Sequence, residues 1–93
     1  MPRTIKKYAN RRLYDTEASR HVTLDGIRQL VAGGEDVVVV DDTTGQDITR
    51  NILLQVISEQ EQGGRPILSA DMLKHIIRFY GNPLQEMMGG YLE

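Results

Sequence analysis

The residues best suited to chemistry gather near the start of the chain, where four cations, two tyrosines and an asparagine lie close together. This segment is the run Ile5-Lys6-Lys7-Tyr8-Ala9-Asn10-Arg11-Arg12-Leu13-Tyr14-Asp15. Cationic side chains bind phosphate and aromatic rings stack on bases, so this mixture is typical of proteins that bind a nucleic-acid backbone. A run of charge can also be a solvated face, and composition alone leaves both interpretations open.

The charge of the chain is unevenly distributed along the sequence. The formal net charge is −2, yet residues 1–28 carry seven Lys or Arg against three acids, a net charge of +4. The remaining residues carry four Lys or Arg against ten acids, a net charge of −6. The sign of the first segment favours an anionic partner such as DNA.

Arg11 and Arg12 are the strongest candidates for contact with DNA. A guanidinium group can form two hydrogen bonds with guanine or with phosphate, and neighbouring side chains of an extended chain point to opposite sides. One arginine could therefore read a base while the other positions the backbone. Asn10 could pair with an adenine edge or could serve as a turn residue, and both interpretations stay open.

The other polar residues of this segment have more general predicted roles. Lys6 and Lys7 are predicted to supply attraction to phosphate that does not depend on base sequence. Tyr8 and Tyr14 could bind phosphates, could stack on bases, or could be half-buried positions of a sheet. The full set of predicted DNA-binding residues is Arg3, Lys6, Lys7, Tyr8, Asn10, Arg11, Arg12, Tyr14 and Arg20.

The chain contains residues of the types that bind metals or catalyse reactions, but their spacing does not match the known motifs for either. His21 and His75 stand far apart and the chain has no cysteine, so we predict no metal site. The acids around Gly45 lack the spacing and the distal Glu of a calcium loop, and a hairpin turn explains them better. No glycine pair has a Walker lysine, and no Ser or Thr has a nucleophile motif. We therefore predict a protein that is not an enzyme and needs no cofactor.

Hydrophobic periodicity predicts an α+β fold, a small mixed domain of short antiparallel strands and helices followed by two C-terminal amphipathic helices. Four consecutive valines at 37–40 lack alternation, which predicts a strand covered on both faces by helices or by another subunit. The predicted strands lie near residues 4–8, 12–14, 20–23, 36–41 and 46–48, and the predicted helices near 24–33, 49–62, 70–80 and 83–93.

The two C-terminal helices are predicted to present large apolar stripes. These stripes could pack internally on the sheet, or could form a surface for self-association or for an apolar partner such as a polymer. The pattern reaches Glu93 without a stop signal, which predicts that the natural chain continues. The candidates for polymer binding or oligomerisation are Met72, Ile76, Phe79, Tyr80, Leu84, Met87, Met88, Tyr91 and Leu92.

The composition is that of a small soluble protein, with 93 residues, 40% hydrophobic and 26% charged. No apolar run approaches membrane-spanning length and no signal sequence is recognisable, so we predict no membrane partner and a location compatible with the cytoplasm. The valine strand and the four helical stripes offer more apolar surface than one small body easily covers, which predicts a homodimer or larger assembly.

The chain resembles the bacterial polyhydroxyalkanoate (polyhydroxybutyrate) synthesis repressors, also called accumulation regulators. The resemblance rests on the runs 5–16, 21–24 and 37–61, and it extends to 76–81 followed by Leu84-Gln85. It covers essentially the whole chain. It implies a DNA-binding regulatory domain at residues 1–63 and the start of the accumulation-regulatory segment at residues 64–93.

The resemblance also implies a function. Members of this family are cytoplasmic repressors of genes for phasins, the proteins that coat polyester granules, and nascent polyester releases them from DNA. The implied partners are a double-stranded DNA operator, the polyester or its granule surface, and further copies of the chain, with residues 6–14 in the segment assigned to DNA binding. The family's usual C-terminal extension is absent here.

An alternative from another functional class is an adaptor that does not bind DNA, oligomerises, and docks on granules or on another protein. The positive charge of residues 3–12 favours the repressor over this adaptor.

Overall fold

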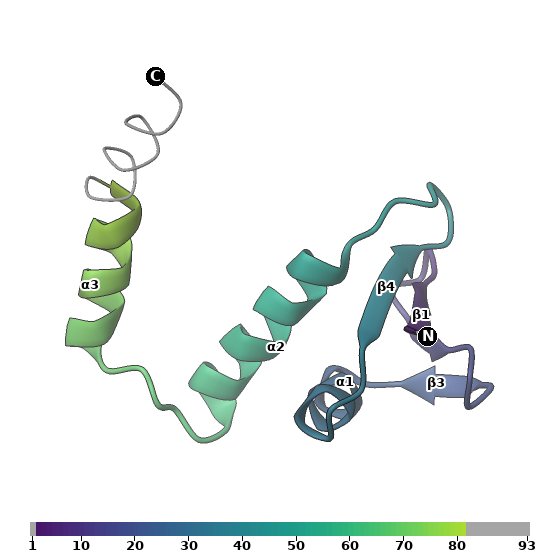
Figure 1. Ribbon diagram of the computed structural model, residues 1–93, viewed down its shortest axis with the longest axis horizontal. Helices are drawn as coiled ribbons and strands as arrows, with labels where there is room; N and C mark the ends of the chain where they lie inside the picture. Colours follow the sequence, from purple (N-terminus) through teal and green to yellow (C-terminus); the bar gives the residue numbers. More distant parts are fainter. Residues whose placement is uncertain (1, 82–93) are drawn as a thin grey trace. The chain divides into compact units, whose positions relative to one another are not determined.

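The computed structural model describes residues 2–81 of the protein. The chain divides into two units, residues 1–60 and 61–93, and each is described by itself. The first unit combines a four-stranded sheet with two helices, so the prediction of an α+β fold is confirmed (Figure 1). Its elements are β1 (Arg3–Lys7), β2 (Leu13–Asp15), β3 (Arg20–Val22), α1 (Leu24–Ala32), β4 (Val37–Asp41) and α2 (Thr49–Gly63).

The sheet has the strand order β3-β2-β1-β4 and is mixed. The pairs β1–β2 and β2–β3 are antiparallel, as predicted for short strands joined by turns. The strand β4 pairs parallel with β1, which the sequence pattern did not predict. This pairing follows from the crossover, because α1 carries the chain back along the sheet before β4 begins.

One hydrophobic core joins the sheet to both helices. Ile5 and Val39 from the central strands are fully buried against Ile27 of α1 and Ile52 of α2. Because α1 and α2 both contribute to this single cluster, they cover the same face of the sheet (Figure 1). The buried apolar residues of the core are Ile5, Leu13, Ile27, Val37, Val39 and Ile52.

The helix α1 packs closely on the sheet because its first turn contains a glycine. The hydroxyl of Thr23 accepts a hydrogen bond from the Gly26 N–H at 3.0 Å, which caps the helix. A Cβ at Gly26 would lie only 2.5 Å from Cγ2 of Val22. Any side chain at this position would therefore push α1 away from β3.

The burial of the valine strand alternates instead of being uniform. Val37 and Val39 are buried beneath the helices, whereas Val38 and Val40 are only half-buried on the opposite face. Within the described part of the first unit, helices thus cover one face of β4. Cover of both faces by helices is therefore wrong for the described part of this unit, and cover of the second face by another subunit stays a prediction.

The strand predicted near residues 46–48 is reduced to a single bridge between Val40 and Asp47. The carboxylate of Asp47 accepts hydrogen bonds from the N–H and the hydroxyl of Thr49, at 2.9 and 2.6 Å. These bonds turn the chain into α2 immediately, so no residues remain for a strand. The predicted turn before it is confirmed, with Gly45 at φ 75°.

The second unit contains α3 (Ala70–Gly81) in its described part, where a helix was predicted at 70–80. Ser69 caps this helix, because its hydroxyl accepts a hydrogen bond from the Met72 N–H at 3.1 Å. The carboxylate of Glu61 accepts hydrogen bonds from the N–H groups of Ile67 and Leu68, which fixes the turn before α3. The helix predicted at 83–93 lies outside the described residues.

Candidate nucleic-acid interface

The turn between β1 and β2 places the predicted arginine pair at an exposed tip, the hairpin tip (residues 8–12). The Tyr8 N–H donates to the carbonyl of Arg12, and the Arg11 N–H donates to the carbonyl of Tyr8, both at 2.9 Å. The side-chain oxygen of Asn10 accepts the Arg12 N–H at 3.1 Å. Asn10 is therefore a turn residue, which leaves its NH₂ group for a partner.

Arg11 adopts a backbone conformation that side chains usually avoid. Its φ is 65°, in the left-handed region that glycine occupies at least cost. For a residue with a Cβ, this conformation costs about 1 kcal/mol. Arg11 is also exposed, so packing of its side chain does not explain why an arginine stands here. Strain of this kind at a surface position is a pointer to function.

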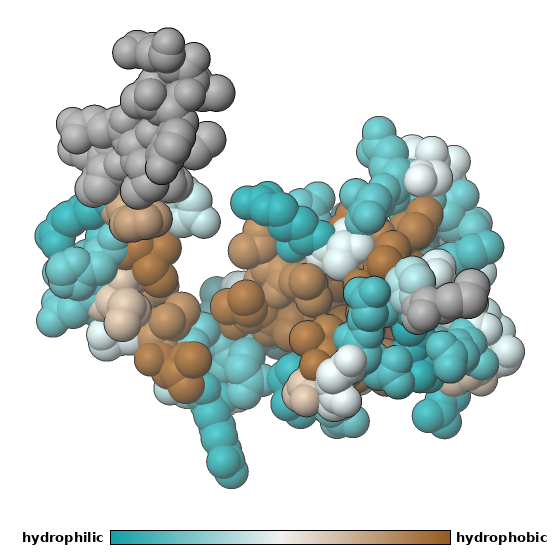
Figure 2. Space-filling model, viewed as in Figure 1, coloured by the Kyte–Doolittle hydropathy of each residue, from teal (hydrophilic) through white to brown (hydrophobic). Residues whose placement is uncertain are grey.

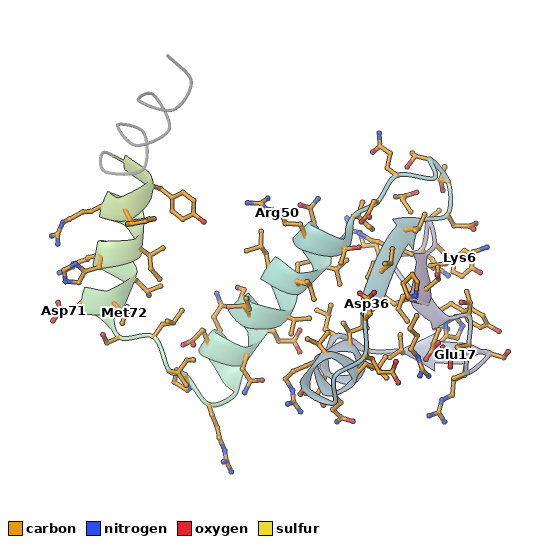
Figure 3. All side chains as sticks on the ribbon, in the orientation of Figure 1. Lys6, Glu17, Asp36, Arg50, Asp71 and Met72 are labelled. Carbon is orange, nitrogen blue, oxygen red and sulfur yellow. The ribbon has the colours of Figure 1, made fainter. Side chains whose placement is uncertain are left out.

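The sheet face opposite the helices, which we call the open face, carries a row of aromatic side chains. The ring centroids of Tyr8 and Tyr14 lie 6.2 Å apart, and those of Tyr14 and His21 lie 5.5 Å apart, both edge to face. Lys6 pairs with Tyr14 across the strands and projects on the side away from α2 (Figure 3). The open face is therefore aromatic and basic, and it is continuous with the hairpin tip.

The two predicted lysines lie on opposite faces of β1, because successive side chains of a strand alternate. Lys6 belongs to the open face, where its ammonium lies 3.8 Å from a carboxylate oxygen of Asp42. Both side chains of this pair are more than two-fifths exposed, so the ion pair leaves Lys6 accessible. Lys7 is half-buried on the helix side of the sheet.

Arg3 lies at the other end of β1, far along the strand from the hairpin tip. Its Nε and one terminal nitrogen donate to the same oxygen of Asp15, at 3.0 and 2.8 Å. Carboxylates of Glu17 and Glu35 lie 3.9 and 3.7 Å from its other terminal nitrogen. With 16% of its side chain exposed, the guanidinium of Arg3 is held by the fold.

Asp15 is the buried carboxylate that organises this end of the hairpin. Burial would raise the pKa of Asp15, but hydrogen bonds from Arg3 and from the N–H groups of Ala18 and Glu17 outweigh it. The pKa of Asp15 therefore lies below its ordinary value. Arg20 pairs with Asp15 across the strands at the same end and is exposed. The predicted DNA-binding set thus divides between two ends of one hairpin.

The structure also reveals a residue that sequence analysis set aside. No functional role was predicted for His21, which is exposed, completes the aromatic row and lines a cavity beside the hairpin tip. Its position opposite Tyr14 in the register is what brings it there. The available signal was the alternation in the strand near 20–23, but the pairing partner depends on the length of the preceding loop.

Each of the two units also exposes an apolar surface (Figure 2). In the second unit, Met72, Ile76, Phe79 and Tyr80 of the predicted polymer-binding set are exposed on α3, together with Leu73 and Ile77. In the first unit, a groove of about 310 Å³ lies between α1 and α2. The apolar residues that line this groove are Val31, Ala32, Leu53, Val56 and Ile57. The remaining candidates Leu84, Met87, Met88, Tyr91 and Leu92 lie outside the described residues.

Within residues 2–81, no group of three or more His, Cys, Asp or Glu side chains is placed to hold a metal ion. In the same part of the chain, no helix is both long and apolar enough to cross a membrane.

Comparisons with known proteins agree with this arrangement. Residues 4–64 match the PHB/PHA accumulation regulator DNA-binding domain, and residues 68–93 match the PHB accumulation regulatory domain. No solved structure matches the chain.

Two curated relatives are similar over nearly the whole chain. An uncharacterized protein of Allochromatium vinosum is 56% identical over 91 residues, which is 98% of this chain and 60% of that protein. An uncharacterized protein in the phbA 5' region of Thiocystis violacea is 57% identical over 91 residues, which is 98% of this chain and 66% of that protein. The chain thus spans less than two thirds of the length of either relative. With both of its domains matched, the chain belongs to the family of PHB/PHA accumulation regulators, and residues 4–64 are its DNA-binding domain.

Proposed function

We propose that this protein is a transcriptional repressor that inserts the hairpin tip into a groove of duplex DNA. The observation that carries the proposal is Arg11, an exposed arginine held in a left-handed conformation at the end of a two-stranded ribbon. The major groove of B-DNA is wide enough to admit such a ribbon, and arginine is its commonest reader of guanine.

Each residue near the hairpin tip has a distinct proposed role. Arg11 reads a base edge, Arg12 binds the phosphate backbone, and the NH₂ group of Asn10 is available to a base. Lys6 and Tyr14 on the open face contact the backbone that flanks the groove. Arg3 is left out of this interface because Asp15 already holds its guanidinium.

Arg20 and Lys7 stand apart from the hairpin tip. Arg20 lies at the opposite end of the hairpin, and Lys7 faces the helix side of the sheet. We propose that both add to the general attraction for DNA without reading bases.

The substitution Arg11→Gly tests this proposal, because it removes the guanidinium and relieves the backbone strain at once. We expect binding to an operator selected in vitro from random duplexes to weaken by about tenfold to a hundredfold. The protein itself should be as stable as before or more stable by about 1 kcal/mol. Unchanged affinity would refute the role of Arg11.

The chain offers a matched control at Ser19. This exposed residue also has a positive φ, 56°, and lies in the loop between β2 and β3, at the other end of the hairpin. Ser19→Gly should bring the same relief of strain and leave DNA affinity unchanged. Equal losses of affinity in both variants would show that the effect comes from backbone flexibility.

We further propose that the regulated genes encode phasins and that polyester binding at the second domain releases the DNA. The support is the exposed apolar face of α3 in the accumulation regulatory domain, which suits a polymer of ester and methylene groups. The variant Ile76→Glu should sediment poorly with polyhydroxybutyrate granules. Lys74→Glu, which introduces the same residue at a polar position of the same helix, should sediment normally.

Self-association is a second proposed property, supported by the groove between α1 and α2. Its lining is largely apolar, and Val31 and Ile57 within it are about half exposed, which suits a second copy of the chain. Light scattering should therefore give a mass of at least twice 10.5 kDa, and Ile57→Glu should lower it. A monomeric wild-type protein would refute this proposal.

The dependence of DNA affinity on salt concentration distinguishes the repressor from the alternative, an adaptor that does not bind DNA. Contacts of Arg12, Lys6 and their neighbours with phosphate release counterions, so affinity for duplex DNA should fall steeply as salt rises. The adaptor predicts no saturable DNA binding at any salt concentration. We also propose, on the same basis, that the protein acts at the nucleoid and at the granule surface.

A further inference from the structure

The first unit contains a cavity of about 350 Å³ beside the hairpin tip, at the edge of the sheet formed by β3. Its polar lining comes from Arg11, Arg12 and His21, and Thr23 adds a hydroxyl where α1 begins. The rest of the lining is apolar and consists of Leu13, Val22 and Leu24. The cavity therefore combines cationic groups with an apolar floor.

The charges around this cavity are unbalanced. Its lining residues include two arginines and one histidine but no Asp or Glu. Among the described residues, neither Arg11 nor Arg12 has a carboxylate within ion-pair distance, whereas Arg3 at the other end of the hairpin has three. Such a cavity attracts an anion, and the apolar floor adds room for an uncharged group attached to that anion.

The hydrogen bonding of His21 determines which of its nitrogens can respond to that anion. Nδ1 lies 3.3 Å from the carbonyl oxygen of Leu13. A carbonyl oxygen can only accept, so Nδ1 carries the hydrogen and Nε2 is the nitrogen that gains a proton. The Tyr14 ring contacts the imidazole edge to face, and Arg11 and Arg12 line the same cavity, whose lining contains no carboxylate.

We propose that this cavity binds one sugar-phosphate unit of the DNA backbone and that His21 takes up a proton when the phosphate binds. The inference rests on the proposed DNA-binding function and deepens it. The guanidinium of Arg12 holds the phosphate oxygens, Val22 and Leu24 contact the deoxyribose, and the imidazolium adds a second charge, while Arg11 reads the adjacent base. Because binding takes up a proton, DNA affinity rises as pH falls.

The pH dependence of DNA affinity tests this inference. The probe is a fluorescent duplex of random sequence, about 30 base pairs long, whose Kd is measured by anisotropy at constant ionic strength. Between about pH 7.5 and pH 6, affinity of the wild-type protein should rise by about fivefold to tenfold, as expected for one linked proton. In His21→Gln this rise should be lost.

His75 provides the matched control, because the chain contains only two histidines. His75→Gln should keep the full pH response, which assigns any difference from His21→Gln to His21 alone. Equal pH responses in wild-type protein and His21→Gln would overturn the inference. Melting curves of both variants at each pH report whether either substitution unfolds the protein.

The two proposals fail in different ways. Absence of DNA binding by the wild-type protein at every pH would overturn the proposed function and this inference together. Binding that Arg11→Gly weakens but that ignores pH would overturn the cavity alone. Inorganic phosphate should compete no better than chloride at equal ionic strength, because it lacks the sugar; strong competition would show a site for free phosphate instead.

Discussion

Arg3 and Arg11 lie near opposite ends of one hairpin, and the chain around them differs in two ways. Arg3 extends over Asp15, with Glu17 and Glu35 within 4 Å of its guanidinium. Arg11 has no such partner among the described residues and holds a left-handed backbone at the surface. The guanidinium of the first arginine stabilises the fold, whereas the guanidinium of the second has no ion-pair partner among the described residues. The contrast shows that a count of cations overstates the charge available to DNA.

The largest expected effect comes from breaking the Arg3 end of this comparison. Arg3→Met removes the partner of a carboxylate that is almost fully buried, and an unpaired buried charge is strongly destabilising. We expect the melting temperature to fall by about 10 °C or more. Arg12→Met, the same replacement at the hairpin tip, should change it by less than about 2 °C. Similar falls in both variants would contradict the assigned difference.

The next largest effect is expected for Gly26→Ala, which tests whether α1 must pack closely on β3 beside the cavity. The new methyl group would lie 2.5 Å from Cγ2 of Val22, so α1 must shift away from β3. We expect a loss of about 1–3 kcal/mol in the free energy of unfolding, measured with urea. Gly63→Ala meets no neighbouring atom and should be tolerated. A neutral Gly26→Ala would mean that this contact relaxes easily.

Acid should weaken the Arg3 end of the hairpin more than the hairpin tip. The pKa of Asp15 is lowered in the folded protein, so its contribution to stability is present above about pH 4 and is lost as pH falls through the lowered value. Thermal melting from about pH 7 to pH 2 should show this decline. The pKa values of Asp25 and Asp47 are also lowered, so Asp15→Asn should reduce the slope without abolishing it.

How much of the fold and of the candidate site could be predicted from the sequence depends on how far apart the interacting residues lie along the chain. The turn around Asn10 uses a neighbour two positions away, and a turn was one of the two interpretations that the sequence left open for Asn10. The Arg3–Asp15 pair spans twelve positions and exists only because the register of β1 with β2 brings the two residues together. A charge pattern alone could not separate Arg3 from Arg11.

The same limit applies to the sheet and to the cavity. The parallel pairing of β4 with β1 requires the whole hairpin and α1 to be placed first. The cavity lies between the hairpin tip and the junction of β3 with α1. The position of that junction depends on the close contact of Gly26 with Val22, which the sequence pattern did not predict. Helix positions were predicted from periodicity because their stripes repeat locally.

The smallest expected effect concerns Lys6 on the open face, and it sharpens the difference between charges that read bases and charges that only attract. Lys6→Met removes one exposed ammonium whose ion pair with Asp42 is long and solvated, so stability should change little. Affinity should fall about threefold to tenfold for every duplex alike, and the slope of log affinity against log salt should decrease by about one. Arg11→Met, by contrast, should weaken the selected operator more than a random duplex. If Lys6→Met also lost more affinity for the operator than for random DNA, the open face would itself contribute to sequence recognition and the hairpin tip would not be the sole reader.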